Sequence, residues 1–271
     1  MRTLQSLATL QGEMVRLRTS GQRIGFVPTM GFLHDGHLSL MRLAREQCDH
    51  LVVSIYVNPL QFGPNEDLDR YPRDPEGDAA KCESVGVDTL FLPETLYDDD
   101  HSTTVAVAGL TRGLCGTSRP GHFDGVTTVV ARLFGIVQPH IAVFGEKDYQ
   151  QLAVIRRMVR DLCLPVEVVG GPLIRDSDGL ALSSRNKYLD AAARGRALSL
   201  RQALQAIKDH PSPSATERIK DGMSVLRADR VDYLEIVHPE TLMPLAEIDG
   251  PARALVAAWI GKTRLIDNLE L

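Results

Sequence analysis

Apolar and polar positions alternate along the first two thirds of the chain in a way that predicts strands and helices in turn. Short apolar, β-branched segments are typical of strands buried on both faces, whereas apolar residues that recur every three or four positions are typical of helices. Strands are expected at 24–27, 51–57, 87–92, 141–144 and 166–169. Helices are expected from about residue 38, and at 78–85, 126–137 and 149–162. Repeated strand–helix units predict an α/β fold with a parallel sheet and helices on both faces.

The pattern changes after Ile174, where residues 176–179 (Asp-Ser-Asp-Gly) supply a turn. Beyond this turn the expected elements are a long helix at 191–209, a break at 211–214, a second helix capped by Thr216, and strands of a smaller sheet at 231–237 and 252–260. We therefore predict a first domain at 1–175 and a smaller α+β domain at 176–271. Gly179 permits a hinge between them, and a static turn fits the same residues.

The length of 271 residues fits two domains, or one large α/β domain with an appendage. Hydrophobic residues make up 44% of the chain and charged residues 24%, which excludes collagen-like, coiled-coil and largely disordered proteins. The net charge of −5 argues against a general nucleic-acid-binding protein, because such proteins usually carry a basic face. A local basic pocket is still compatible with this charge.

No apolar run reaches the ~18–20 residues that a membrane span needs. The start of the chain also lacks the sustained apolar region of a signal peptide. The cysteines at positions 48, 82, 115 and 163 show no Cys-x-x-Cys spacing. A zinc site is therefore not expected, and the cysteines are expected to be reduced thiols in a cytoplasmic protein.

The segment Pro28–His37 (Pro-Thr-Met-Gly-Phe-Leu-His-Asp-Gly-His) lies between the first predicted strand and the first predicted helix, where α/β sheets bind ligands. Its glycines let the backbone approach a ligand closely, and the N-terminus of the following helix offers free N–H groups to an anion. His34 and His37 can donate hydrogen bonds to phosphate oxygens. A pair of solvated histidines is the plainer alternative.

Three further groups of polar residues follow predicted elements. Gly145–Asp148 comes directly after a buried strand, and Lys147 within it can hold a phosphate as a point charge. Leu182–Arg185 offers two hydroxyls and a guanidinium to a polyphosphate. Asn58 and Gln61, at the end of the second strand, can orient a small polar substrate without adding charge. Each group taken alone also fits an ordinary polar turn.

Two other nucleotide-binding patterns are incomplete. Gly261-Lys262-Thr263 ends like a P-loop, but the position that requires the earlier glycine holds Val256. No Gly-x-Gly-x-x-Gly pattern follows the first predicted strand either. P-loop and nicotinamide chemistry are therefore disfavoured.

Taken together, these segments resemble the pantoate–β-alanine ligase (pantothenate synthetase) family. His34-Asp35-Gly36-His37 is similar to the His-x-Gly-His signature of the nucleotidyltransferase superfamily, and longer blocks carry the closer resemblance: 28–37, 57–67, 121–123, 145–148 and 182–185. The resemblance covers most of residues 1–190 and continues weakly to the C-terminus. It implies a Rossmann-like first domain that binds nucleotide and pantoate, followed by a C-terminal lid domain.

The family resemblance implies an amide-forming ligase of coenzyme A biosynthesis that works in two steps. Pantoate attacks the α-phosphate of ATP to give pantoyl adenylate and pyrophosphate, and the amine of β-alanine then displaces AMP to form pantothenate. The resemblance also implies a cytoplasmic homodimer joined through the first domain, with no nucleic-acid or membrane partner. Mg²⁺ is expected with ATP, but without a protein ligand, because Gly77 and Lys81 flank Asp78 where the family's metal contacts would lie.

The roles of the family's residues are expected at the matching positions. Catalysis is expected from His37, His34 and Lys147, and pantoate binding from Gln61, Gln151 and Asn58, with Gln61 also near β-alanine. The role of His122 stays open between a flap over the site and a surface loop. Contacts with ATP are expected from Met30, Gly31, Phe32, Leu33, His34, Asp35, Gly36, His37, Gly145, Glu146, Lys147, Asp148, Ile174, Leu182, Ser183, Ser184 and Arg185.

Two other functions stay open from the residues alone. An adenylyltransferase would use the same phosphate-binding groups but leave AMP on its product. A non-catalytic nucleotide-binding module would also bind ATP at these segments. The presence of both His37 and Lys147 disfavours such a module, because it has no need of them.

Overall fold

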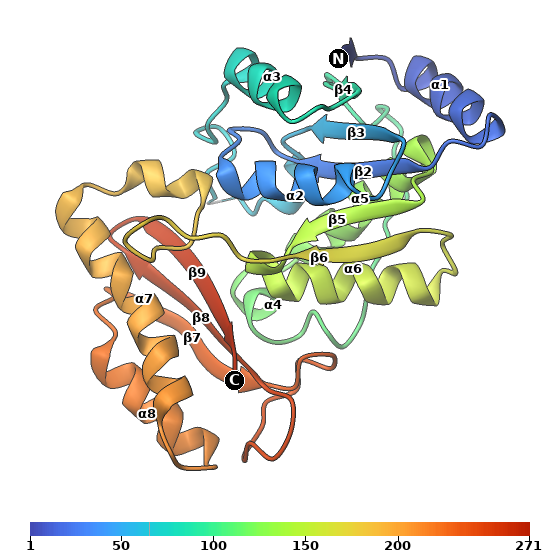
Figure 1. Cartoon of the computed structure of the whole chain (residues 1–271). Coiled ribbons are helices and arrows are strands. Elements are labelled where there is room, and N and C mark those ends of the chain that lie inside the picture. The colour runs from blue at the N-terminus through green and yellow to red at the C-terminus, as the bar shows by residue number, and fades with distance from the viewer. Residues whose placement is uncertain (65) are drawn as a thin grey trace. The chain divides into compact units, whose positions relative to one another are not determined.

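The computed structural model describes residues 1–64 and 66–271, so Asn65 of the 57–67 block lies outside the described residues (Figure 1). The chain divides into two compact units, which are described separately. The first unit comprises residues 1–108, 119–146 and 151–172. The second unit comprises residues 109–118, 147–150 and 173–271. Two short segments from the first two thirds of the sequence thus belong to the second unit.

A six-stranded sheet forms the centre of the first unit, and all its neighbouring strands are parallel. In spatial order the strands are β1 (Arg2–Leu4), β4 (Thr89–Phe91), β3 (His50–Ile55), β2 (Ile24–Thr29), β5 (Ile141–Gly145) and β6 (Glu167–Gly171). The predicted α/β fold with a parallel sheet is confirmed. The sequence pattern ended the first predicted strand before Pro28, whereas β2 continues to Thr29. Proline is tolerated there because β2 pairs with β5 only at Gly25 and Phe26, which leaves that edge of Pro28 without a ladder partner.

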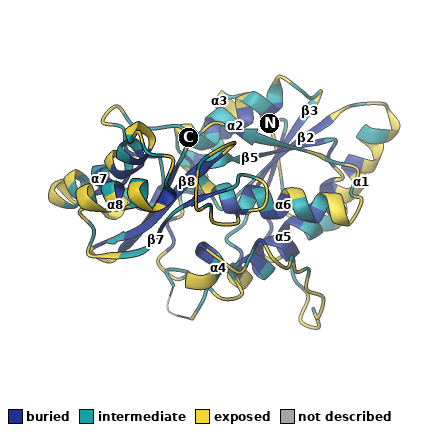
Figure 2. Cartoon of the chain, turned by 90° about the horizontal axis from the view of Figure 1, so that it is seen from below, coloured by how far each residue is buried: buried dark blue, intermediate teal, exposed yellow. Residues whose placement is uncertain are grey.

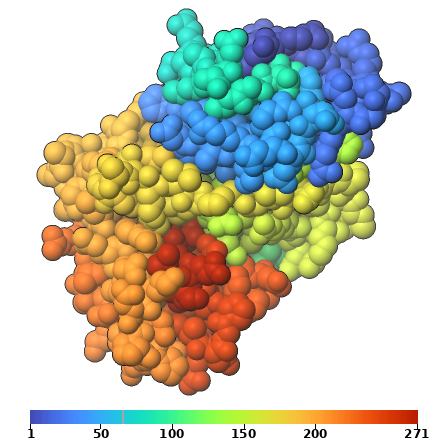
Figure 3. All heavy atoms as spheres, in the orientation of Figure 1, coloured from blue at the N-terminus to red at the C-terminus, as the bar shows by residue number. Residues whose placement is uncertain are grey.

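Helices cover both faces of this sheet, and each face has its own apolar core. On one face, α1 (Leu7–Thr19), α5 (His122–Val137) and α6 (Tyr149–Asp161) pack against the strands. On the other face lie α2 (Asp35–Arg45) and α3 (Pro75–Ser84). Figure 3 shows α2 in blue and α3 in teal at the surface of this unit. The sheet is therefore buried on both sides, as its continuous apolar strands require.

Several element boundaries differ from those expected from apolar spacing. Helix α2 begins at Asp35 and α5 at His122, each a few residues earlier than predicted, because their first turns carry polar and glycine residues that periodicity does not register. Helix α3 begins at Pro75, where the Asp74 side chain accepts a hydrogen bond from Gly77 N–H. Strand β1 and helix α1 were not predicted from the sequence. Strand β1 has only three residues, and α1 buries only Leu10, Glu13 and Met14.

The second unit contains an antiparallel sheet of β7 (Arg230–Val237), β8 (Arg253–Ile260) and β9 (Thr263–Glu270). Its apolar core joins this sheet to α7 (Ala191–Asp209) and α8 (Ala215–Val225). Figure 2 shows α7 and α8 with exposed residues on the faces turned away from the strands. The unit also contains the short helix α4 (Cys115–Ser118), the 3₁₀ turn η3 (Ser184–Tyr188) and most of the 3₁₀ turn η2 (Glu146–Asp148), while η1 (Pro59–Gln61) belongs to the first unit.

Two predictions about the second unit are wrong. Ser214, and not Thr216, caps α8, since its hydroxyl accepts a hydrogen bond from Glu217 N–H. Strand β9 was not predicted, because two successive polar residues, Asp267 and Asn268, interrupt its apolar pattern although both are buried. In the part of the chain that the structure describes, no helix is both long and apolar enough to cross a bilayer.

Candidate active site

The Pro28–His37 loop leaves the C-terminal end of β2 and leads into α2. Gly31 and Phe32 have φ angles of 82° and 50°, so the backbone turns through the left-handed region at two successive residues. A Cβ on Gly31 would lie 2.9 Å from Ile55 Cγ2 and 3.0 Å from Asp78 Oδ2. Glycine is required at this position both for its conformation and for the close approach.

The carboxylate of Asp78 holds this loop in place from α3. Its two oxygens accept hydrogen bonds from Phe32 N–H and Leu33 N–H, both at 2.7 Å. Asp78 is only 1% exposed. Burial raises the pKa of its carboxyl, and the two backbone hydrogen bonds act in the opposite direction. The loop conformation therefore depends on a buried carboxylate that is distant in sequence.

Asp78 also bears on metal binding, because the family's metal contacts would lie at this part of α3. Both of its oxygens already accept hydrogen bonds from backbone N–H groups. Within residues 1–64 and 66–271, no three His, Cys, Asp or Glu side chains come together as a metal site. Asp78 thus already has a structural role in this loop.

The rings of His34 and His37 lie against each other in a tilted arrangement at the start of α2, with ring centroids 4.1 Å apart. Nδ1 of His37 lies 3.3 Å from the backbone N–H of His34 and accepts a hydrogen bond from it. A neutral imidazole that accepts at Nδ1 carries its proton at Nε2. His37 thus presents an N–H donor on the side of the ring opposite the backbone.

The 3₁₀ turn η1 follows β3; Asn58 directly precedes this turn, and Gln61 is its last residue. The Gln61 side chain reaches the Pro28–His37 loop, where its Nε2 lies 3.0 Å from Met30 Sδ. Asn58 Nδ2 donates to Gln61 Oε1 and to Gly125 O, and Asn58 Oδ1 accepts from Leu60 N–H and Tyr97 O–H. These contacts occupy both ends of the Asn58 amide and hold it against Gln61.

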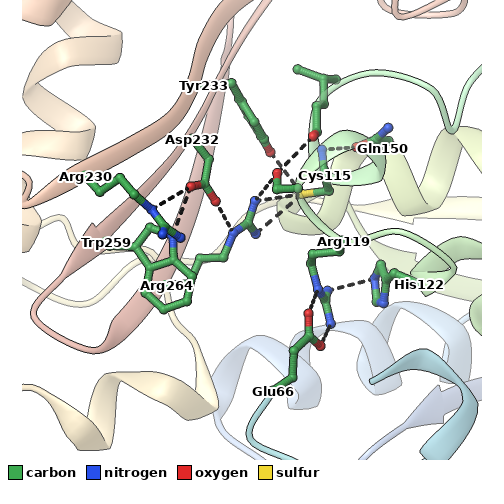
Figure 4. Close-up of polar contacts among 12 residues, drawn as sticks. Glu66, Cys115, Arg119, His122, Gln150, Arg230, Asp232, Tyr233, Trp259 and Arg264 are labelled. Carbon is green, nitrogen blue, oxygen red and sulfur yellow. Dashed lines mark hydrogen bonds and ion pairs between the residues drawn. The ribbon is translucent and has the colours of Figure 1, made fainter. Parts of the chain in front are cut away.

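An ion pair between Arg119 and Glu66, which was not predicted from the sequence, also supports Gln61. Arg119 forms two hydrogen bonds of 2.6 Å with the Glu66 carboxylate and contacts His122 Nε2 at 2.9 Å (Figure 4). Arg119 and His122 also contact the Gln61 carbonyl oxygen, at 3.3 and 2.8 Å. Burial disfavours ionisation of Glu66, but the hydrogen bonds and charge of Arg119 outweigh it and lower the pKa of that carboxyl. His122 is the first residue of α5 and belongs to this support.

Helix α5 approaches η1 so closely that only glycine fits between them. A Cβ on Gly125 would lie 2.3 Å from the carbonyl oxygen of Leu60 and 2.6 Å from the backbone nitrogen of Gln61. Both neighbours are main-chain atoms, so a side chain at position 125 has to displace η1 itself. The backbone position of Gln61 therefore depends on α5.

Lys147 lies in η2, in the second unit. Its ammonium is 3.6 Å from the Asp148 carboxylate, and its carbonyl oxygen accepts a hydrogen bond of 3.1 Å from Asn268 Nδ2. The Lys147 side chain is 20% exposed. Because the 3.6 Å separation makes the pairing with Asp148 weak, the partly buried ammonium of Lys147 is also able to bind a phosphate.

The other segments of the second unit predicted to bind ATP meet in a hairpin. Leu182 N–H donates to Ile174 O at 3.0 Å, and Arg175 pairs with Ala181 in an antiparallel bridge. The residues from 183 onward enter η3, which the Ser183 hydroxyl caps by accepting from Arg185 N–H. The structure thus brings Ile174 beside Leu182, which lies eight positions further along the chain.

The first unit accordingly brings together the Pro28–His37 loop and Gln61, and the second unit carries Lys147 and the hairpin. The sequence matches the family model described as "Pantoate-beta-alanine ligase" over residues 2–270. The chain belongs to this family. The resemblance noted from the sequence blocks is therefore confirmed, and it extends over almost the whole chain.

Pantothenate synthetases from other organisms match this chain over nearly their full length. The pantothenate synthetase of Syntrophotalea carbinolica is 51% identical over 99% of this chain and 98% of its own length. That of Thermus thermophilus is 53% identical over 100% of this chain and 99% of its own. These two matches therefore span nearly the full length of both sequences.

Solved structures of pantoate–β-alanine ligases have the same fold. The crystal structure of the Thermus thermophilus enzyme superimposes with a TM-score of 0.93 at 52% identity, covering 100% of this chain and 99% of that one. The Francisella tularensis enzyme, crystallised as a complex with "Beta-gamma ATP and Beta-alanine", gives a TM-score of 0.83 at 33% identity, covering 100% and 97% of the two chains. The Rossmann-like assignment of the first unit is thereby confirmed.

Proposed function

We propose that this protein joins pantoate to β-alanine at the expense of ATP, in two steps. The pantoate carboxylate attacks the α-phosphate of ATP, which forms pantoyl adenylate and releases pyrophosphate. The amine of β-alanine then attacks the acyl carbon, loses a proton and displaces AMP, which leaves the amide pantothenate. The observation that carries this proposal is the match to the pantoate–β-alanine ligase family over residues 2–270.

In the first step, negative charge develops on the α-phosphate oxygens and on the departing pyrophosphate. We assign His37 to the stabilisation of that charge through its Nε2–H, because its Nδ1 is engaged by His34 N–H. His34 packs against the same ring and holds its orientation. The remaining residues of the Met30–His37 loop would contact the nucleotide through their backbone, which Asp78 holds in place.

The second unit is proposed to supply the fixed positive charge. Lys147 would bind the phosphates as a point charge, and Arg185 would bind them through its planar guanidinium. The hydroxyls of Ser183 and Ser184 would add neutral donors, and Ile174 would pack beside the adenine ring. Gly145, Glu146 and Asp148 would line the nucleotide on either side of Lys147.

Pantoate is proposed to bind to the amides of Gln61 and Gln151, with Gln61 also close to β-alanine. Asn58 would contribute by orienting Gln61, to which its Nδ2 donates at 3.3 Å. Amide groups suit a substrate with hydroxyls and a carboxylate, since they donate and accept without adding charge. Mg²⁺ is proposed to arrive with ATP and to be held by the phosphates, because the oxygens of Asp78 are already engaged.

We further propose that the enzyme is a cytoplasmic homodimer joined through the first domain, with residues 176–271 serving as a lid domain. The support for each of these statements is family membership. Size-exclusion chromatography with light scattering measures the oligomeric state directly. A monomer over the whole accessible concentration range would contradict the dimer and leave the proposed reaction unaffected.

Product analysis with ATP, Mg²⁺, pantoate and β-alanine tests the proposed function, with each component omitted in turn. The expected result is equimolar AMP, pyrophosphate and pantothenate, formed in steady state only when both organic substrates are present. Pyrophosphate without released AMP, or turnover indifferent to β-alanine, would point instead to an adenylyltransferase. Binding of ATP without any turnover would leave only a nucleotide-binding module.

Replacing Gln61 by alanine is expected to raise the KM for pantoate by about tenfold or more while changing that for ATP much less. The reason is that loss of a buried amide leaves pantoate's polar groups without their partner. Steady-state kinetics with each substrate varied in turn measures the effect. Equal changes in both KM values would contradict a dedicated role in binding pantoate.

Replacing Gly125 by alanine is also expected to raise the KM for pantoate, because the new Cβ would displace the main chain of Leu60 and Gln61. We expect a destabilisation of about 1–3 kcal/mol as well, typical of overpacking. Gly135→Ala is the matched control, since it lies in the same helix and a Cβ there would meet no atom within 4 Å. If both variants behave alike, the close approach of α5 to η1 has no functional consequence.

A further inference from the structure

The turn that carries Lys147 is held by the second unit rather than by the elements that flank it in sequence. Residues 147–150 belong to the second unit, whereas β5 before them and residues 151–161 of α6 after them belong to the first. A 3₁₀ turn of three residues has little internal hydrogen bonding. Contacts that this short segment makes within the second unit therefore help to set the position of Lys147.

Asn268, on β9, makes one of these contacts. It is 4% exposed, and its Nδ2 donates to the Lys147 carbonyl oxygen at 3.1 Å. Its Oδ1 accepts a hydrogen bond of 2.7 Å from Arg253, on the neighbouring strand β8. The amide oxygen and the amide nitrogen of Asn268 are both hydrogen-bonded. Only one orientation of this amide therefore lets it donate to the Lys147 carbonyl oxygen.

Arg253 reaches the same turn in a second way. Its guanidinium carbon lies 4.0 Å from the centroid of the Tyr149 ring, within the range of a cation–π contact. Arg253 is 9% exposed, and it also forms a 3.4 Å ion pair with Glu270 at the end of β9. Arg253 thus contacts the turn through Tyr149 and, by way of Asn268, through Lys147.

The far end of the segment is anchored by Gln150, which is also buried. Its Oε1 accepts from Cys115 N–H at 2.9 Å (Figure 4). Its Nε2 donates to the carbonyl oxygens of Leu110 and Gly113 at 2.8 and 2.9 Å. Arg264 of β9 lies 3.5 Å from Cys115 Sγ and forms a 2.7 Å ion pair with Asp232. The small sheet therefore contacts the segment directly at one end and through α4 at the other.

We propose that Asn268 and Arg253 are positioning residues for Lys147, so that the antiparallel C-terminal sheet determines where this ammonium meets the phosphates of ATP. The inference rests on the proposed function and deepens it. A displacement of about 1 Å in a group that stabilises a transition state is enough to cost on the order of a hundredfold in rate. Both residues are proposed to act without contacting substrate. Asn268 acts through the Lys147 carbonyl oxygen, and Arg253 acts through Asn268 and the Tyr149 ring.

The test compares Asn268→Ala and Asn268→Asp with the natural protein in kcat/KM for ATP. We expect each variant to lose about ten- to hundredfold, with the KM for pantoate unchanged. Asn268→Asp keeps an acceptor for Arg253 and loses the donor to Lys147, so it separates the contact with the turn from the integrity of the sheet. Its melting temperature is expected to stay near that of the natural protein.

A double-mutant cycle distinguishes positioning from a general structural role. In a Lys147→Ala background, Asn268→Asp is expected to change kcat/KM for ATP by less than about twofold, because the group it positions is gone. Ser199→Ala is the matched control: Ser199 is 1% exposed, and its hydroxyl accepts a hydrogen bond from Arg227 N–H in the same unit, far in sequence from the turn. We expect this control to lower the melting temperature without changing kcat/KM.

Full activity in folded Asn268→Asp, or equal losses with and without Lys147, would overturn the proposal. Normal kinetics in Lys147→Ala would overturn it too, since the lysine would then have no role to support. Affinity for a non-hydrolysable ATP analogue, measured by calorimetry across the same cycle, gives a second readout that needs no turnover. A natural protein that binds the analogue but makes no pantothenate would refute the proposed function, and coupling in analogue affinity would still decide whether Asn268 positions Lys147.

Discussion

Replacing Lys147 by alanine is expected to lower the rate of pantoyl adenylate formation by roughly a hundred- to thousandfold. This corresponds to about 3–4 kcal/mol of transition-state stabilisation, the usual contribution of one prearranged donor to developing charge. The ammonium is partly buried and lies 3.6 Å from the Asp148 carboxylate, and the other two residues of η2 are both acidic. Rapid-quench measurement of pyrophosphate release, with β-alanine omitted, isolates this step.

Lys220→Ala serves as the control for the Lys147 variant. Lys220 is an exposed residue of α8, and the change removes the same charge from the second unit away from the proposed site. We expect its adenylation rate to match that of the natural protein. A normal rate in Lys147→Ala, with the fold intact, would remove this lysine from the mechanism.

Replacing Asp78 by alanine is expected to lower the free energy of unfolding by about 2–6 kcal/mol and to reduce adenylation with it. The change leaves Phe32 N–H and Leu33 N–H without their acceptors, and each such group costs about 1–3 kcal/mol when it stays buried. The loop that carries His34 and His37 would lose its support at the same time. Denaturant unfolding and single-turnover kinetics measure the two effects.

Two further variants distinguish the roles of the Asp78 carboxylate. Asp78→Asn keeps the shape of the side chain but turns an amide N–H₂ group toward a backbone donor, so we expect a smaller loss of stability and still a clear loss of adenylation. Glu76→Ala removes a carboxylate from the exposed face of the same helix and should alter neither. Unchanged activity in Asp78→Asn would show that the loop does not need the carboxylate.

The elements that the sequence predicted well have a strong local signal. Helix α7 was predicted with its observed bounds, because apolar residues repeat through it without interruption and Asp190 caps its first turn. Strand β5 and most of β3 consist of apolar residues between polar turns. Where the local signal is weak, as in α1 or in β9 with its buried Asp267 and Asn268, the prediction failed.

The residues of the candidate site also differ in how well the sequence predicted them. The Pro28–His37 loop, Lys147 and Leu182–Arg185 were all proposed from the sequence, because their polar residues stand out beside predicted strands and turns. The groups that hold them were not found. Asp78 lies 46 residues from Phe32, Arg119 lies 53 residues from Glu66, and Asn268 lies 121 residues from Lys147.

The sequence by itself determined the alternation of strands and helices, the family, and the side chains expected to meet ATP and pantoate. Three features were decided by the tertiary structure alone. The Asp78 carboxylate is hydrogen-bonded to the loop, Gly125 lets η1 approach α5, and Asn268 donates to the turn of Lys147. The physical reason is that periodicity and turn chemistry act between neighbouring residues. A buried hydrogen bond between distant segments leaves no local pattern, because its two partners are brought together only by folding.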